Sequence, residues 1–141
     1  MDEWEKFLRF NLDTNVESII RASLDDAQSV LHQFIHDPLT IKVMNQTTQM
    51  ICEVFRDRGR IFTCGNGGSM CDAMHFAEEW TGRFRADRQP LPAMALSDPA
   101  HLTCVANDFG FDEVFARSIT AFGRPGDLLI PISTSGNSQN V

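Results

Sequence analysis

The sequence is short of positive charge and has no long apolar run. Its 141 residues carry 12 lysines and arginines against 19 aspartates and glutamates, a formal net charge of −7. This balance argues against nucleic acid or an anionic membrane as the main partner, because both attract basic surfaces. No apolar stretch approaches the ~20 residues that a membrane-spanning helix needs, and the acidic segment Met1–Lys6 differs from a secretory signal. We therefore expect a cytoplasmic protein that binds neither nucleic acid nor membranes.

Paired cysteines and repeats are also missing. Cys52, Cys64, Cys71 and Cys104 form no CxxC pair and no zinc-finger spacing, which favours reduced thiols over disulfides. No internal repeat or low-complexity segment is present. Hydrophobic residues at 43% and charged residues at 22% are ordinary values for a globular protein, so the chain should fold as one domain or part of one.

Residues 1–59 carry no glycine before Gly59 and show helical periodicity. Apolar residues recur at helical spacing from Val16 to Phe34 and again from Ile41 to Phe55. Because proline restricts the residue before it, Asp37-Pro38 should separate two helices, and Gly59 should cap the second. We expect residues 1–59 to form a helical unit that packs on a sheet or on another subunit, and residues 60–141 to form the ligand-binding unit.

The pattern changes after Gly59, where short apolar runs alternate with helical segments. We predict strands over residues 60–64, 91–96 and 127–132, separated by helices over residues 71–82, 99–106 and 111–122. This alternation is typical of an α/β fold with a parallel sheet flanked by helices. The chain stops at Val141, before the crossover that a fourth strand would need, so we expect the C-terminal part of the sheet to be missing from it.

A glycine-rich turn follows the first predicted strand. Gly65-Asn66-Gly67-Gly68-Ser69 lies between strand and helix, where free backbone amides and the helix dipole attract anions. Glycine lets the backbone approach such a ligand closely. The turn lacks the Lys-Ser/Thr pair of a Walker loop and the spacing of GxGxxG, so by itself it is equally typical of a tight structural turn.

A second polar turn follows the third predicted strand, which we expect to be buried. Ser133-Thr134-Ser135-Gly136-Asn137-Ser138 supplies hydroxyls and amides that can orient toward phosphate oxygens. Because the carboxyl ends of parallel strands meet at one edge of a sheet, both turns should border one ligand site. The alternative interpretation of this segment is a helix cap or a Ser/Thr turn.

The helix between these turns carries a histidine and several acidic residues. His75 and Glu79 are four residues apart and so share one helix face. They could be two ligands of one metal, an acid–base pair, or an ordinary surface charge pair, and a zinc site would need further ligands from elsewhere. Glu78 should point about 100° away from Glu79, toward solvent or a partner.

Two further polar pairs could reach a substrate. Ser97-Asp98 lies at the end of the strand predicted over residues 91–96, and Asp98, before Pro99, is either a helix N-cap or a substrate contact. Asn107-Asp108 follows the helix predicted over residues 99–106. Neither pair alone distinguishes a structural role from a binding role.

These motifs, taken in order, resemble those of phosphoheptose isomerases, a family of sugar isomerase (SIS) domain enzymes. The resemblance implies an SIS-type parallel sheet and conversion of sedoheptulose 7-phosphate to D-glycero-D-manno-heptose 7-phosphate through an enediol, in lipopolysaccharide precursor synthesis. It also implies a zinc cofactor and a homotetramer with sites shared between subunits. It covers most of residues 50–141 and rests on Cys64–Ser69, Cys71–Glu79, Thr81–Arg83, Ser97-Asp98, Asn107–Gly110 and Ser133–Ser138.

The resemblance implies roles for individual residues. Glu79 matches the family's catalytic acid–base glutamate, and His75 and Glu79 match two zinc ligands. The family's second catalytic group, a histidine that also binds zinc beside a glutamine, has no counterpart in these 141 residues, so we expect the chain alone to be inactive. The implied substrate contacts are Asn66, Gly67, Gly68, Glu79, Asn107, Asp108, Ser133, Thr134, Ser135 and Ser138.

Two other functions fit parts of the pattern. A non-enzymatic SIS protein that binds a bacterial replication initiator shares the fold and the serine turn, but that interpretation suits a chain without His75 and Glu79. A phosphosugar-sensing regulatory domain would need a DNA-binding segment, which this sequence lacks. The isomerase hypothesis accounts for the most residues.

Overall fold

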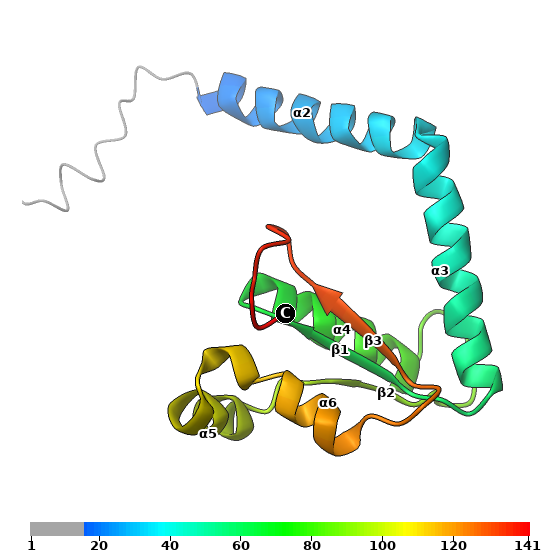
Figure 1. Cartoon of the computed structure of the whole chain (residues 1–141). Helices are drawn as coiled ribbons and strands as arrows, with labels where there is room; N and C mark the ends of the chain where they lie inside the picture. Colours follow the sequence, from blue (N-terminus) through cyan, green and yellow to red (C-terminus); the bar gives the residue numbers. More distant parts are fainter. Residues whose placement is uncertain (1–15) are drawn as a thin grey trace, which may run out of the picture. The chain divides into compact units, whose positions relative to one another are not determined.

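The structure is a computed structural model that describes residues 16–141 (Figure 1). The chain divides into two compact units, one ending at Gln46 and one running from Thr47 to Val141. This division lies within a helix, whereas the sequence pattern places the boundary at Gly59. The expectations for residues 1–15, including the acidic segment Met1–Lys6, lie outside the described residues. Among the helices that are described, none is both long and apolar enough to cross a membrane.

The described N-terminal part consists of two helices, as predicted. α2 spans Val16–His36 and α3 spans Pro38–Arg56. Between them, the Asp37 carboxylate accepts hydrogen bonds from the Leu39 N–H and the Thr40 hydroxyl, both at 3.0 Å. The ring of the proline at the first position of α3 removes an N–H that would have no helical partner there. The predicted break at Asp37-Pro38 is therefore confirmed.

The end of α3 differs from the expected glycine cap. Arg58, not Gly59, takes the left-handed conformation with φ of 62°. The N–H groups of Arg58 and Gly59 donate to the carbonyls of Phe55 and Val54 at 3.2 and 2.7 Å, which is the Schellman arrangement. Gly59 is needed for another reason, because a Cβ at this position would collide with the Gly126 carbonyl oxygen.

Three parallel strands form the sheet, in the order β2-β1-β3. β1 spans Ile61–Gly65, β2 spans Ala93–Ala95 and β3 spans Leu128–Ile132. All five residues of the central strand β1 are buried, so the predicted α/β fold with a parallel sheet is confirmed. β2 begins later than predicted because Pro92 has no N–H to donate to the ladder, and it ends at Ala95. β3 is half-buried rather than buried, because it is an outer strand of the described sheet, a position that also tolerates Pro131.

Helices cover both faces of the sheet (Figure 1). α4, Gly68–Thr81, packs on one face, and α5, Pro99–Phe109, packs with α6, Ala116–Phe122, on the other. Successive side chains of β1 point to opposite faces. Ile61 therefore enters the core beneath α4, and Phe62 enters the core beneath α5 and α6.

The helix boundaries differ from the prediction in three places. α4 begins at Gly68 rather than at residue 71, because the glycine turn itself forms the first helical turn. α5 runs on to Phe109, past its predicted end. The helix predicted over 111–122 is divided into the 3-10 helix η1, Phe111–Glu113, and α6. Val114 and Phe115, the two residues after η1, turn into the core, where they are 0% and 3% exposed.

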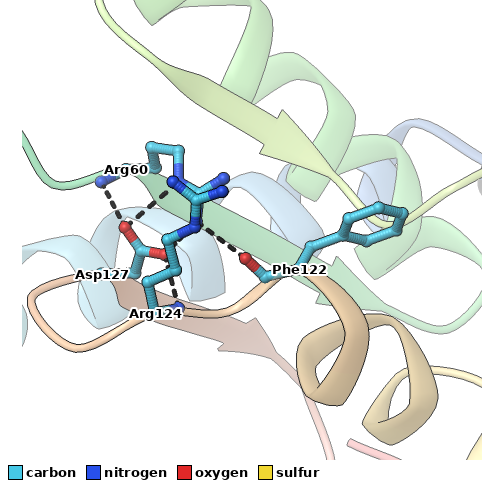
Figure 2. Close-up of polar contacts among 4 residues, drawn as sticks. All are labelled: Arg60, Phe122, Arg124 and Asp127. Carbon is cyan, nitrogen blue, oxygen red and sulfur yellow. Dashed lines mark hydrogen bonds and ion pairs between the residues drawn. The ribbon is translucent and has the colours of Figure 1, made fainter.

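A polar network closes the amino end of the sheet (Figure 2). The Asp127 carboxylate accepts the backbone N–H of Arg60 at 2.9 Å, its guanidinium at 2.7 Å and the Arg124 N–H at 2.9 Å. The same guanidinium donates to the Phe122 carbonyl at 2.7 Å. The hydrogen bond from the Arg60 side chain is the main cause that lowers the pKa of Asp127 to about 2. The network therefore joins the segments that lead into β1 and β3.

Candidate functional site

The glycine turn after β1 leaves the first turn of α4 open. Gly67 is the N-cap residue, with φ of 54°, and no side chain among the described residues caps this helix. A Cβ added at Gly67 or Gly68 would meet no atom within 4 Å, so both glycines face open space. The Ser69 and Met70 N–H groups are already used, since they donate to the Asn66 and Gly67 carbonyls, both at 3.0 Å, which leaves the N–H groups of the two glycines. The open start of α4, with its helix dipole, is the kind of site that binds an anion.

Three serine hydroxyls converge in the turn after β3. The Ser133 hydroxyl lies 3.4 Å from those of Ser135 and Ser138. It also accepts the Gly136 N–H at 3.1 Å, and the Ser135 hydroxyl accepts the Asn137 N–H at 3.2 Å. A separation of 3.4 Å is long for a pair of hydroxyls. These groups are therefore weakly held and able to turn toward the oxygens of a phosphate.

The sheet holds the glycine and serine turns side by side. Gly65, the last residue of β1, pairs with Ile132, the last residue of β3, so both turns leave the sheet at its carboxyl end. Asn66 and Asn140 then join the turns through two side-chain hydrogen bonds of 2.8 Å. A cavity of about 310 Å³ lies between the glycine turn and apolar residues of α5 and η1. Seven of the predicted substrate-binding residues thus lie in two adjacent turns: Asn66, Gly67, Gly68, Ser133, Thr134, Ser135 and Ser138.

His75, Glu78 and Glu79 form a cluster in the second half of α4. The His75 Nε2 atom lies 3.0 Å from Glu79 Oε1 and 3.9 Å from Glu78 Oε1. One candidate ligand atom from each residue lies within 4.8 Å of the others. The shared face of His75 and Glu79 is confirmed. Glu78 is exposed as predicted but also reaches the histidine, because residues three apart are neighbours on a helix.

Arg88 supports the C-terminal end of this cluster. Its guanidinium donates to the backbone carbonyls of Glu79 and Trp80 at 2.6 and 2.8 Å, two groups that a helix end leaves without helical partners. A mostly apolar cavity of about 240 Å³ opens between Arg88, Glu79 and the rings of Phe76, Trp80 and Phe84. Arg88 was not predicted from the sequence. A basic residue soon after a helix end was the available signal.

Asn107 and Asp108 lie in the last turn of α5, not beyond it as predicted. The Asn107 amide donates to Asp108 at 2.8 Å, and the Cys104 thiol lies 3.5 Å from the same carboxylate, which raises the pKa of the thiol. The helix dipole disfavours an aspartate at this end of a helix, so helix stability does not explain Asp108. Asp98, by contrast, is confirmed as the N-cap of α5, because its carboxylate accepts the His101 N–H at 2.7 Å.

The structure does not gather every predicted site residue in one place. Gly68 and Glu79 belong to the same helix, and the eleven residue steps between them correspond to about 16 Å along its axis. Among residues 16–141, no hydrogen bond or ion pair connects Glu79 or Asn107 to the serine turn. The candidate residues form three groups: the two turns, the α4 cluster and the end of α5.

Comparisons with known proteins agree with the fold and with the motifs. The SIS domain family matches residues 24–141. The phosphoheptose isomerase of Edwardsiella ictaluri (strain 93-146) is 51% identical over 125 residues, which are 89% of this chain and 65% of that protein. The phosphoheptose isomerase of Glaesserella parasuis serovar 5 (strain SH0165) is 52% identical over 122 residues, which are 86% of this chain and 64% of that protein.

Solved structures resemble the chain in the same way. The phosphoheptose isomerase GmhA from Neisseria gonorrhoeae has a TM-score of 0.73 and 40% identity, covering 85% of this chain and 62% of that one. A phosphoheptose isomerase from Francisella tularensis has a TM-score of 0.70 and 34% identity, covering 84% and 65%. The chain spans slightly less than two thirds of the length of these relatives. Because the family match extends over most of its residues, the chain belongs to the SIS domain family.

Proposed function

We propose that this chain supplies the phosphosugar-binding part of a phosphoheptose isomerase that converts sedoheptulose 7-phosphate to D-glycero-D-manno-heptose 7-phosphate. The observation that carries the proposal is the pair of adjacent turns, in which two open glycines stand beside three converging serine hydroxyls. Relatives that share about half of the aligned sequence bear that enzyme's name. The product suits lipopolysaccharide precursor synthesis in the cytoplasm.

The phosphate is proposed to bind between the two turns. Amides at the start of α4 and the hydroxyls of Ser133, Ser135 and Ser138 are the donors to its oxygens. A charge-assisted hydrogen bond of this kind contributes ~1.5–3 kcal/mol. The net charge of −7 does not oppose this assignment, because a bound phosphate interacts mainly with the dipoles nearest to it.

Glu79 is the proposed acid–base group. Converting a ketose to an aldose requires removal of a proton from C1 and return of a proton to C2, through an enediol. A carboxylate held beside both carbons can perform both transfers. The side chain of Glu79 is 32% exposed, less than its neighbour Glu78 at 71%, and Arg88 fixes its backbone carbonyl. Asn107 and Asp108 are the proposed contacts to the sugar hydroxyls.

The α4 cluster also fits a zinc ion. His75 and Glu79 would hold it, and Glu78 is within reach as a third donor. Imidazole and carboxylate are both donors that zinc accepts, and the 3.0 Å between Nε2 and Oε1 suits two ligands of one ion. When bound, zinc polarises a substrate oxygen as a Lewis acid. Analysis of the purified protein should find zinc, and full isomerase activity in metal-free protein would exclude this assignment.

A homotetramer with shared sites is the proposed assembly. In one chain the anion-binding turns and Glu79 are separated by about 16 Å along α4. A second copy could therefore bring its Glu79 to a substrate that is bound at these turns. The N-terminal helices offer suitable interface material, since Leu24 and Val30 are 64% and 66% exposed and apolar surface of this kind favours association.

Ligand binding by the 141-residue chain tests the proposal directly. Titration calorimetry with sedoheptulose 7-phosphate should show binding, and unphosphorylated sedoheptulose should bind at least about tenfold more weakly because it forms no charge-assisted bonds. Equal affinity for the two sugars would contradict the phosphate site. We expect no turnover by the chain alone, and measurable turnover would contradict that expectation.

Catalysis is tested at Glu79 in any preparation that shows isomerase turnover. Glu79→Gln keeps the shape of the side chain but removes its basicity, so kcat should fall about 10²–10⁴-fold. Asp72→Asn is the matched control, because Asp72 is an exposed acid on the same helix and lies outside the cluster. A Glu79→Gln protein with wild-type kcat would remove Glu79 from the acid–base role.

A further inference from the structure

Asn66 and Asn140 form a reciprocal amide pair between the two turns. Asn66 Nδ2 donates to Asn140 Oδ1, and Asn140 Nδ2 donates to Asn66 Oδ1, both at 2.8 Å. Each carboxamide gives one donor and one acceptor to the other. Asn140 is 7% exposed, so truncating it would leave buried polar groups without partners, which is costly. The pair directly links the side chains of two residues that lie 74 positions apart in the sequence.

The bridge fixes the serine turn at its second end. Its first end is set by β3, whose last residue, Ile132, pairs with Gly65. Beyond the turn, the Val141 N–H donates to the Ser138 carbonyl at 3.1 Å, and Val141 packs against the core beneath α5 and α6. Asn140 lies between these anchors, and its side chain pairs with that of Asn66 in the glycine turn. The serine turn is therefore held at both ends while its hydroxyls stay loosely paired.

We propose that Asn140 is a positioning residue, which sets the distance between the glycine and serine turns by holding the Asn66 side chain. This inference rests on the proposed phosphosugar site and refines it. Asn140 takes one N–H and one oxygen lone pair of the Asn66 carboxamide and fixes its orientation, so in this proposal the glycine turn meets the phosphosugar through its backbone. Asn66 then acts on the ligand only through the pair, and the two side chains form one functional unit.

A double-mutant cycle tests this unit. Affinity for sedoheptulose 7-phosphate is measured for the 141-residue chain and for Asn66→Ala, Asn140→Ala and the double variant. We expect each single change to weaken binding about tenfold and the double variant to bind no more weakly than either single variant, since residues acting as one unit are non-additive. Losses that multiply in the double variant would show that Asn66 contacts the ligand independently and would overturn the proposal.

A matched control separates positioning from general loss of structure. Gln139→Ala removes a neighbouring but exposed carboxamide and should keep wild-type affinity. Urea unfolding of all variants shows whether weaker binding follows from unfolding. Asn140→Gln lengthens the side chain while keeping its amide, and affinity as poor as that of Asn140→Ala would show that the distance between the turns matters. Wild-type affinity in Asn140→Gln would contradict a distance-setting role.

Proton exchange of the side-chain amides tests the pair without a ligand. In the wild-type chain, nuclear magnetic resonance should show slower exchange for the Asn66 carboxamide than for the exposed Gln139 carboxamide, and Asn140→Ala should remove that difference. Fast exchange at Asn66 in the wild type would overturn the proposal. A chain that shows the protected pair but binds no phosphosugar would instead refute the proposed function, so the two failures are distinguishable.

Discussion

The polar groups at the amino and carboxyl ends of the sheet differ in how closely they are hydrogen-bonded. At the amino end, the Asp127 carboxylate accepts hydrogen bonds of 2.7–2.9 Å from the Arg60 side chain and from two backbone N–H groups. At the carboxyl end, the Ser133 hydroxyl stands 3.4 Å from those of Ser135 and Ser138. The Asp127 side chain is 9% exposed, whereas Ser135 is open to solvent.

The difference separates groups that hold the fold from groups that are free to bind. A buried carboxylate with several short donors has no capacity left for a ligand, and breaking its contacts costs stability. Weakly paired hydroxyls lose little when they turn to a phosphate, so their removal should cost affinity and not stability. Asn66 and Asn140 are the exception at the carboxyl end, because they pair with each other there at 2.8 Å and, as we propose, position the turns that bind.

The largest effect is expected at Asp127. Asp127→Ala should lower the free energy of unfolding by roughly 2 kcal/mol, because three groups lose their acceptor, and should leave phosphosugar affinity nearly unchanged. Urea unfolding followed by circular dichroism measures the change. Asp87→Ala, which truncates an exposed loop aspartate, is the matched control. Unchanged stability in Asp127→Ala would show that the network is dispensable.

Much of the fold could be predicted because the decisive signals are local. The mostly apolar sequence of β1 and the Asp37-Pro38 break follow from burial and backbone chemistry at single positions. The division of the helix predicted over 111–122 could not be predicted in this way, because it depends on a core formed with β1 and α5. Helix periodicity does not report which apolar residues a distant element will cover.

The candidate site shows the same limit. The turn residues could be predicted, because glycine and serine runs after strands are local features. Asn140 was missed, since its role depends on Asn66, 74 positions away. Asn107 was expected beyond α5 but lies within it, because the helix continues despite the dipole penalty at Asp108. A residue that a ligand requires can stand where helix propensity disfavours it. The end of the helix that propensity predicts then falls too early in the sequence.

A smaller effect is expected at Ser138. Ser138→Ala removes one of the converging hydroxyls and should weaken sedoheptulose 7-phosphate binding by about tenfold or slightly more, which is the lower end of the ~1.5–3 kcal/mol of one hydrogen bond to a charged group. The free energy of unfolding should change by less than about 0.5 kcal/mol. Calorimetry and urea unfolding measure the two quantities, with Ser29→Ala on exposed α2 as the control. Loss of stability without loss of affinity would place Ser138 with the structural groups.

The smallest effect is a pH dependence that belongs to the amino end alone. The folded-state pKa of Asp127 is about 2, below the ~3.9 of an unfolded aspartate. The unfolded chain therefore takes up the proton first as pH falls, so the stability that Asp127 contributes is fully present above about pH 4 and is lost as pH falls toward 2.

Asp127→Asn cannot titrate at this position, so between pH 5 and pH 2.5 its unfolding free energy should fall less steeply than that of the wild type. Equal slopes in urea unfolding series would mean that the Arg60 contact does not stabilise the ionised carboxylate in solution. A difference confined to this acid range, with no matching difference in the Ser138→Ala protein, would assign the titration to the network at the amino end and not to the turns.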